Sequence, residues 1–243
     1  MDGAMNRAIL LTFVTLALPA CSVVPQSTAN RTAAPAQSYA EARAASSGPM
    51  ARISAPPPVA RNAAESQCLS DLGQTGAQFE PLPDRYLGDG CSNLGTVQMH
   101  ALASDSGELN LTNIGPVTCP VSAAFAAWVR FGVDRAAQQI YGQRLASVQT
   151  MGSYSCRNVA GTSRRSGHAT AAAIDVGGFV LEDGTRITVT DGWNGSSRDR
   201  EFLRTVQRSA CRRFGTVLGP DYNAAHHDHL HVEGVIEGNS YCR

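Results

Sequence analysis

The chain has 243 residues, with 20 basic and 20 acidic side chains and a formal net charge of zero. Every basic residue is arginine, and charged residues make up only 16% of the chain. A neutral balance argues against a nucleic-acid protein, because following phosphates requires an excess of positive charge. The 43% of hydrophobic residues can support a folded core, which excludes a wholly disordered chain.

The first twenty residues are typical of an export signal. An apolar run at residues 8–18 follows a basic residue and is too short to span a membrane as a helix. It leads into Leu18-Pro19-Ala20-Cys21, which resembles a bacterial lipobox. We interpret residues 1–20 as a lipoprotein signal peptide, with cleavage before Cys21 and lipidation of its thiol. The alternative is an ordinary cleavage site that precedes a cysteine. Ser22 follows the usual rule for outer-membrane lipoproteins, so we expect the chain at the periplasmic face of that membrane.

Residues 21–65 are rich in Ala, Pro and Ser and poor in large apolar side chains. Such a composition cannot bury enough surface to offset the cost of ordering, so it predicts a flexible tether. Residues 66–243 contain aromatic, cysteine and periodic apolar residues, and this length is typical of one domain. We therefore expect a single folded module, a monomer, on a lipid-anchored linker.

Six cysteines remain in the predicted domain after Cys21 is set aside. They are Cys68, Cys91, Cys119, Cys156, Cys211 and Cys242. An even number in an exported chain predicts three disulfides. Among the possible pairings we favour Cys68–Cys91, Cys119–Cys156 and Cys211–Cys242. The absence of a CxxC pair argues against a cysteine-ligated zinc site.

Helix and strand signals follow one another without a regular alternation. Apolar spacing predicts a helix from Pro120 to Gly142, and Gly142 fits a C-cap. A second helix is expected after Ser196 and Ser197, ending near Gly215. Strand patterns lie at residues 107–112, 146–155, 173–181, 186–190 and 229–234. Asp183-Gly184 predicts a hairpin turn. The pattern predicts an α+β fold, with a small antiparallel sheet flanked by helices.

Five of the six histidines fall into two short stretches. The first stretch contains His168 and, seven residues later, Asp175, with small residues between them. An imidazole and a carboxylate are both zinc ligands, and a carboxylate inside an apolar strand is costly unless it is paired or binds a metal. The alternative is a surface histidine together with an aspartate that is hydrogen-bonded at a strand entrance. From this stretch alone the choice stays open.

The second stretch is His226-His227-Asp228-His229-Leu230-His231-Val232-Glu233. On a strand, His229 and His231 share one face while Leu230 and Val232 point to the core. A His-X-His pair in that setting favours a metal or catalytic role over a solvated polar strand. For His226 and His227 a solvated loop is an equally good interpretation, and we expect His100 to be structural or on the surface.

Together, His168, Asp175 and one histidine of the pair, His229 or His231, can form a three-ligand zinc site with an open fourth position, which is the catalytic arrangement. We expect this site to line a cleft carried by the sheet. Zinc lowers the pKa of bound water toward ~7, so the predicted chemistry is metal-assisted hydrolysis, most naturally of an amide. Ligation by His and Asp favours zinc over calcium or magnesium.

These residues carry a family resemblance. The pattern Ser-X-His-X4-Ala-X-Asp, here Ser166, His168, Ala173 and Asp175, resembles that of the D-Ala-D-Ala metallopeptidases, which share a superfamily with lysostaphin-type peptidases and the hedgehog domain. More closely, residues 66–243 resemble the bacterial extensin-like C-terminal domain. The matching segments are SYSCR at 153–157, SGHATAAAIDVGGF at 166–179, FGTVLGPDYN at 214–223 and HHDHLH at 226–231.

The resemblance implies roles for single residues. His168, Asp175 and His231 match the zinc ligands. His229 matches the catalytic histidine of the lysostaphin-like branch, and Asp228 stands where the D-Ala-D-Ala enzymes place a catalytic glutamate. We favour His229 as the base, because on a regular strand Asp228 would point away from the face that carries His229 and His231.

Other positions are less closely determined by the resemblance. Arg157 matches an arginine that stabilises an oxyanion or binds a substrate carboxylate. Ser166 binds substrate or orients its loop. Tyr222 is a candidate hydrogen-bond donor to the reacting group. Trp193 suits core packing better than a substrate groove. At Ala171 the metallopeptidases usually have glycine.

The sequence thus predicts a zinc-dependent peptidase acting on peptidoglycan stem peptides or crosslinks, with no nucleic-acid partner. The alternative is a lipoprotein that binds or scaffolds the cell wall without catalysis and keeps a structural zinc site. The hedgehog branch shows that a similar zinc site can exist without peptidase activity, so the motif by itself does not prove catalysis.

Overall fold

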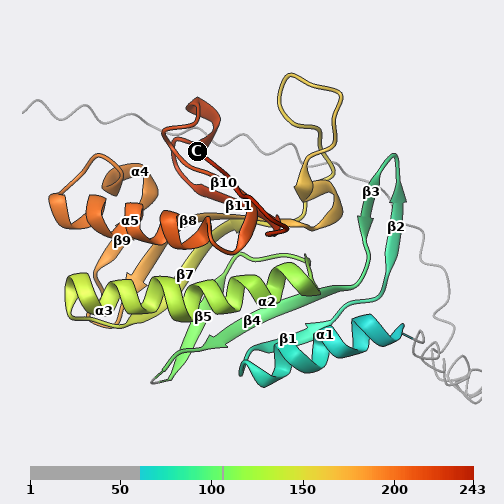
Figure 1. The fold of residues 1–243 in the computed structure, drawn as a ribbon, viewed down its shortest axis with the longest axis horizontal. Helices are drawn as coiled ribbons and strands as arrows, with labels where there is room; N and C mark the ends of the chain where they lie inside the picture. Colours follow the sequence, from blue (N-terminus) through green and yellow to red (C-terminus); the bar gives the residue numbers. More distant parts are fainter. Residues whose placement is uncertain (1–60, 106) are drawn as a thin grey trace, which may run out of the picture. The chain divides into compact units, whose positions relative to one another are not determined.

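The computed structural model describes residues 61–105 and 107–243 (Figure 1). The predicted signal peptide, the lipidation site Cys21 and the linker up to residue 60 lie outside the described residues. The first described helix, α1 (Ala63–Gln74), begins three residues before the predicted start of the domain, and the Asn62 side chain caps it. No helix in the described part of the chain has the length and apolar character needed to cross a membrane.

The fold is α+β, as predicted, but its main sheet is large and mixed. The strands run in the order β1-β4-β5-β7-β8-β11-β10-β12, with β6 on β4 and β9 on β8. Their bounds are β1 (Gln78–Pro81), β4 (Thr96–Ala103), β5 (Glu108–Thr112), β6 (Val117–Thr118), β7 (Leu145–Gly152), β8 (Ala173–Leu181), β9 (Arg186–Thr188), β10 (Phe214–Leu218), β11 (Leu230–Val235) and β12 (Tyr241–Cys242).

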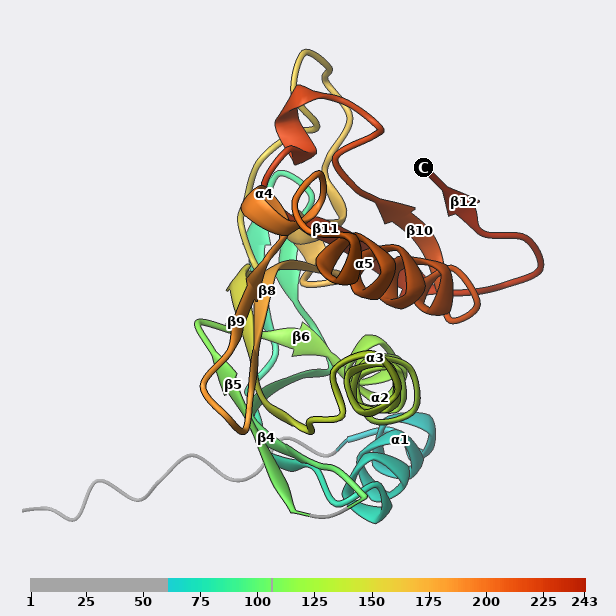
Figure 2. The same ribbon diagram turned by 90° about the vertical axis from the view of Figure 1, so that its left-hand side faces the viewer.

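Two parallel pairs distinguish this sheet from the antiparallel sheet that the sequence predicted. β5 pairs in parallel with β7, because the long helical crossover between them returns the chain to the same end of the sheet. β10 pairs in parallel with β12, since the intervening β11 reverses the direction once and β12 reverses it again. The helices α1, α2, α3 and α5 lie on one side of the strands (Figure 2).

The predicted helix from Pro120 to Gly142 is present but is not uniform. It consists of α2 (Cys119–Trp128), a π-helical segment η1 (Val129–Asp134) and α3 (Arg135–Tyr141). Gly142 is the left-handed C-cap that the sequence predicted, with φ of 68°. Gly132 in η1 lies close to α5, where an added Cβ would come within 2.3 Å of Ser209 Oγ. A residue without a side chain therefore permits the close approach of these two helices.

The second predicted helix, α5 (Ser197–Ala210), begins as expected, with the Ser196 side chain as its N-cap. Its predicted end near Gly215 is wrong, because Phe214 starts strand β10. Phe214 is fully buried, and a buried aromatic fits the end of a helical pattern as well as the start of a strand. The predicted strand at 186–190 likewise ends at Thr188 and continues as the short helix α4 (Val189–Gly192).

Aromatic side chains fill the core between the sheet and the helices. Trp128 packs edge-on against Phe179 and Phe214, and its indole N–H donates to the Val206 carbonyl at 3.0 Å. Trp193 is also buried, and it donates to Asp221 at 2.8 Å. Both tryptophans are therefore packing residues, which is the role expected for Trp193.

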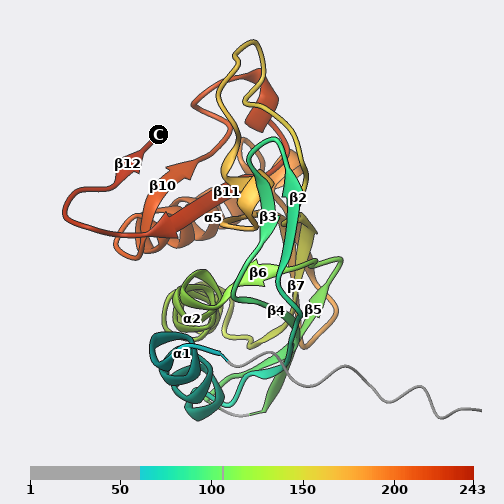
Figure 3. The same cartoon turned by 90° about the vertical axis from the view of Figure 1, so that its right-hand side faces the viewer.

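A separate two-stranded sheet projects from the domain beside the loop that follows β7 (Figures 1 and 3). It is formed by β2 (Arg85–Gly88) and β3 (Cys91–Asn93). This hairpin was not predictable from the sequence, because its strands are too short to show a period.

The described residues contain three disulfides, and two of the favoured pairings are wrong. Cys211–Cys242 forms as predicted, whereas the other bonds are Cys68–Cys119 and Cys91–Cys156. Cys68 lies on α1, which packs against α2, and α2 begins with Cys119. Cys91 begins β3, the second strand of the projecting hairpin, and bonds to Cys156 in the loop after β7. The tertiary packing, and not proximity in the sequence, therefore decides which cysteines meet.

Candidate metal centre

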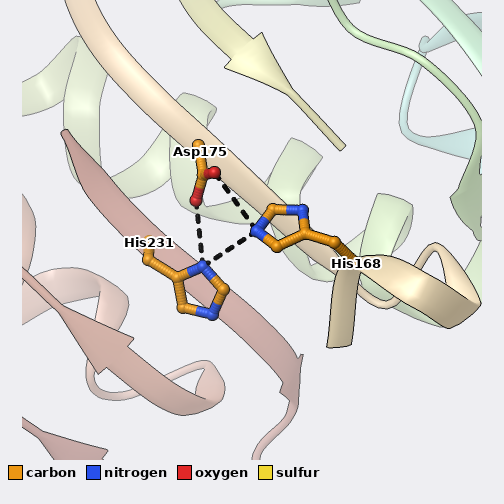
Figure 4. Close-up of side chains that lie close together, drawn as sticks. All are labelled: His168, Asp175 and His231. Atoms are coloured by element: carbon orange, nitrogen blue, oxygen red, sulfur yellow. Dashed lines mark hydrogen bonds and ion pairs between the residues drawn. The ribbon is translucent and has the colours of Figure 1, made fainter. Parts of the chain in front are cut away.

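Three elements bring His168, Asp175 and His231 together (Figure 4). His168 lies in the short 3-10 helix η2 (Gly167–Thr170), which leads into β8, and Asp175 lies on β8 itself. His231 lies on the neighbouring strand β11, directly opposite Asp175 in the antiparallel register. One potential ligand atom from each residue lies within 4.8 Å of the other two.

The distances between these atoms suit a small tetrahedral ion. His168 Nε2 lies 3.2 Å from His231 Nδ1 and 3.2 Å from a carboxylate oxygen of Asp175. His231 Nδ1 lies 2.9 Å from the other oxygen of Asp175. Ligand atoms bound at ~2.0–2.2 Å around a tetrahedral zinc ion are about 3.3–3.6 Å apart. The three groups are therefore close to the spacing that zinc requires.

The outer nitrogen of each imidazole is held by a hydrogen-bond acceptor. His168 Nδ1 donates to the Ser153 carbonyl at 2.6 Å, and His231 Nε2 donates to the Glu233 carboxylate at 3.0 Å. Such outer contacts fix the ring orientation and the tautomer of metal-binding histidines. His168 thus presents Nε2 and His231 presents Nδ1 to the common centre.

The electrostatics of the group favour a cation. Burial raises the pKa of Asp175, but hydrogen bonds from His168 and His231 outweigh it and hold that pKa well below its usual range. Burial lowers the pKa of His231, but its hydrogen bonds to Asp175 and Glu233 raise the pKa to about 9. Two ionised carboxylates thus flank one imidazole. A metal ion among the three groups would take the place of the proton on His231 Nδ1.

Asp228 and His229 form a hydrogen-bonded pair beside the centre. His229 Nδ1 donates to Asp228 Oδ1 at 2.8 Å, and His229 Nε2 lies 3.5 Å from Asp175 Oδ1. The predicted common face of His229 and His231 is present, since both rings approach Asp175 while Leu230 is fully buried in the core. Asp228 lies behind the imidazole of His229, on the side away from Asp175.

His226, which the sequence left without a role, also lies at the site. Its ring centroid is 5.2 Å from that of His229 and 5.9 Å from that of His231. Burial and the nearby charges of those two histidines lower the pKa of His226 to about 4. The position of His226, one turn before the His-X-His pair, is the signal that could have indicated its place at the site.

The remaining histidines lie in solvent-exposed surroundings. His227 is an exposed loop residue, and its Nδ1 contacts the Ala224 carbonyl at 2.9 Å. His100 is exposed on β4, with its nearest acid, Glu80, at 3.9 Å. The surface location expected for His100 is therefore confirmed.

Glu233 is a second site residue that the sequence analysis missed. Besides accepting from His231, its carboxylate packs so closely on Gly167 that a Cβ at that position would lie 2.4 Å from Glu233 Cδ. Glu233 thus touches both the strand that carries His231 and the 3-10 helix that carries His168. The spacing of His231 and Glu233, two residues apart on β11, was the available signal.

The proposed substrate residues lie around this group in different settings. Tyr222 is 40% exposed, and its ring packs edge-on against His226 at 5.4 Å. Arg157 is exposed, and within the described part of the chain its guanidinium makes no hydrogen bond or ion pair. Its backbone carbonyl accepts from the Ser166 amide at 3.1 Å. The predicted cleft around these residues stays a prediction.

Ser166 and Ala171 shape the turn that carries His168. Ser166 is buried and caps η2 by accepting from the His168 amide at 3.4 Å. This contact supports loop orientation, one of the two roles that the sequence left open. Ala171 ends η2 in the left-handed conformation, with φ of 54°. That conformation is the one that glycine adopts most easily.

Comparison with known proteins gives a family for the chain. No curated protein and no solved structure matches it. The family model described as "Extensin-like protein C-terminus" matches residues 66–243, a range that contains all the residues of the candidate centre. The chain therefore belongs to the family of extensin-like protein C-termini.

Proposed function

We propose that this protein is a zinc-dependent peptidase that hydrolyses peptidoglycan stem peptides or their crosslinks while anchored as an envelope lipoprotein. One observation carries the proposal. Two imidazole nitrogens and a carboxylate oxygen converge within ligand distance of one another, and the opposite nitrogen of each ring is already engaged by an acceptor. That arrangement serves a metal ion better than it serves packing, because burial of these polar groups is costly without a cation.

The donor set matches zinc better than a harder cation. His168 and His231 offer nitrogen, and Asp175 offers oxygen. Calcium and magnesium prefer six or more oxygen ligands, whereas zinc accepts a mixed set of three protein ligands and keeps one position open. When bound, zinc supplies a Lewis acid that polarises a carbonyl group and acidifies water.

His229 is the general base in this proposal. Its Nδ1 donates to Asp228, so in the neutral ring Nε2, which lies 3.5 Å from Asp175 Oδ1, carries no proton and can accept one. Nε2 would accept a proton from the attacking water and later return it to the amine that leaves. Asp228 would orient the imidazole and stabilise its protonated form, in the manner of other base–orienter pairs.

Arg157 is the candidate group for the substrate's negative charge. Its guanidinium has no partner in the described residues, and its positive charge contributes to lowering the pKa of His226. A guanidinium can bind a carboxylate through two hydrogen bonds or stabilise an oxyanion that forms during attack. Stem peptides carry such carboxylates, and the predicted export signal and tether would bring the domain to the compartment that holds them.

The decisive test combines metal content with hydrolysis. Purified full-length protein should hold about one zinc per chain, and His231→Ala should lose it. The wild type should release peptide fragments from muropeptides. His229→Ala should keep its metal but lose about 10²–10⁴-fold in rate, because it lacks the base.

Two results would contradict the proposal. Absence of zinc from the wild type, with none taken up on addition, would remove the metal centre. Zinc binding without hydrolysis of any muropeptide would instead favour the non-catalytic wall-binding lipoprotein.

A further inference from the structure

His168 is held from the outside by one short segment that follows β7. The Ser153 carbonyl accepts from its ring at 2.6 Å, and the Ser155 amide donates to its backbone carbonyl at 3.1 Å. Both the imidazole and the main chain of this residue thus depend on where residues 153–155 lie. Ser153 is buried and its hydroxyl donates to the Pro116 carbonyl at 2.9 Å, whereas Ser155 is exposed.

A disulfide fastens the exposed end of that segment. Cys156 directly follows Ser155 and bonds to Cys91, the first residue of β3. Cys91 is fully buried, and β3 packs against η2, the 3-10 helix that carries His168. The bond therefore connects the segment that contacts His168 to a strand that supports the same helix from another side.

A second contact fastens the far end of the same loop to the same hairpin. Arg165 Nε donates to the Asp89 carbonyl in the β2–β3 turn at 2.5 Å, and its guanidinium also donates to Asn158 at 2.8 Å. The loop from 156 to 165 is thus attached to the hairpin at both ends, and Figures 1 and 3 show the two lying side by side. Such outer supports set how precisely a metal ligand is held.

We propose that the Cys91–Cys156 disulfide, supported by Arg165, is a positioning element for the metal ligand His168. The β2–β3 hairpin then acts as a brace for the metal centre and contributes no ligand of its own. This inference rests on the proposed zinc site. Without the bond, Ser153 and Ser155 would sample other positions. Metal binding would then have to order His168 and this segment, and the conformational entropy lost would weaken the affinity for the metal.

The test compares two disulfide variants of the full-length protein. Cys91→Ser/Cys156→Ser removes the brace, and Cys211→Ser/Cys242→Ser removes a bond between the end of α5 and β12, elements that carry none of the proposed ligands. Zinc affinity is measured by competition with a chromophoric chelator, and the ligand geometry is followed through the absorption spectrum of bound cobalt. The brace variant should bind zinc about 10-fold more weakly with an altered cobalt spectrum, whereas the control should stay within about twofold of the wild type.

A second pair of variants keeps the test decisive if the disulfide variant does not fold. Arg165→Ala loosens the same hairpin contact without touching a cysteine, and Arg186→Ala, an exposed arginine on β9, is its control. Arg165→Ala should weaken zinc binding by about threefold or more, and Arg186→Ala should leave it unchanged. Circular dichroism spectra confirm that each variant is folded before the titration.

The outcomes separate this inference from the proposed function. If the wild type binds no zinc, the metal centre itself is refuted. If the wild type binds zinc and both brace variants bind it equally well, with an unchanged cobalt spectrum, the brace is refuted while the peptidase proposal stands. If the control disulfide variant loses as much affinity as the brace variant, the effect is one of general stability and the inference also fails.

Discussion

The two histidines of the candidate centre present different ring nitrogens to it. His168 uses Nε2 because the Ser153 carbonyl takes its Nδ1–H, and His231 uses Nδ1 because Glu233 takes its Nε2–H. The first acceptor is part of the backbone, so substitution cannot remove it. Glu233 is a side chain, and it is therefore the outer contact whose contribution mutation can measure.

Glu233→Gln should weaken zinc binding by about 10-fold, because glutamine can accept the hydrogen bond but removes the negative charge that strengthens the ligand. Glu237→Gln is the matched control, since Glu237 is an exposed glutamate four residues further along the chain. Chelator competition measures both affinities. Equal affinity in Glu233→Gln and the wild type would mean that the carboxylate does not act on His231.

At the scale of elements, the packing of the helical segment from Cys119 to Tyr141 depends on a close approach between η1 and α5. Its π-helical part, η1, brings Gly132 against Ser209 on α5, and a Cβ added to Gly132 would also meet the Trp128 side chain. The same tryptophan packs against Phe214 and Phe179. Gly132 thus allows η1, α5 and the aromatic side chains of the core to pack closely together.

Gly132→Ala should lower the free energy of unfolding by about 1–3 kcal/mol, the usual cost of overpacking. Its Cβ would lie 2.3 Å from Ser209 Oγ and 3.0 Å from a Trp128 carbon, so the helices would have to move apart. Gly73→Ala on α1 is the control, because an added Cβ meets nothing within 4 Å there. The control should be neutral or stabilising by up to ~1 kcal/mol, as expected from helix propensity. Urea unfolding measures both, and a neutral Gly132→Ala would contradict the close packing.

At the scale of the whole molecule, the candidate centre joins parts that are far apart in the chain. Its ligands come from η2, β8 and β11, and the last two are neighbours only because β11 returns to pair with β8. An ion bound to all three would hold the native arrangement and would have no equivalent site in the unfolded chain. Metal binding should therefore stabilise the fold as a unit.

Zinc at about 100 times its dissociation constant should stabilise the protein by about 2.7 kcal/mol, which corresponds to a rise of about 5–10 °C in Tm for a domain of this size. Differential scanning calorimetry with zinc and with a chelator measures the difference. His231→Ala should show the same Tm in both conditions. A zinc-dependent rise that persists in His231→Ala would place the bound ion elsewhere.

Patterns that depend on near neighbours were predictable from the sequence. The strand at 173–181 lies where its apolar run predicted, and Gly142 ends its helix because glycine adopts the left-handed conformation most easily. His229 and His231 share a face because side chains alternate along an extended chain. The grouping of His168, Asp175 and His231 was also readable, through its resemblance to a known motif.

Other features depend on which distant segments pack together, and only the tertiary structure decided them. The pairings Cys68–Cys119 and Cys91–Cys156 follow from the packing of α1 on α2 and of the hairpin on the loop after β7. The parallel strand pairs follow from how connections cross the sheet. The contacts of Ser153, Glu233 and His226 with the candidate centre follow from strand register and loop placement, which no local pattern encodes. Sequence thus determined the donor types and their local faces, while long-range packing determined their partners, because a hydrogen bond or disulfide forms only between groups that the fold brings within reach.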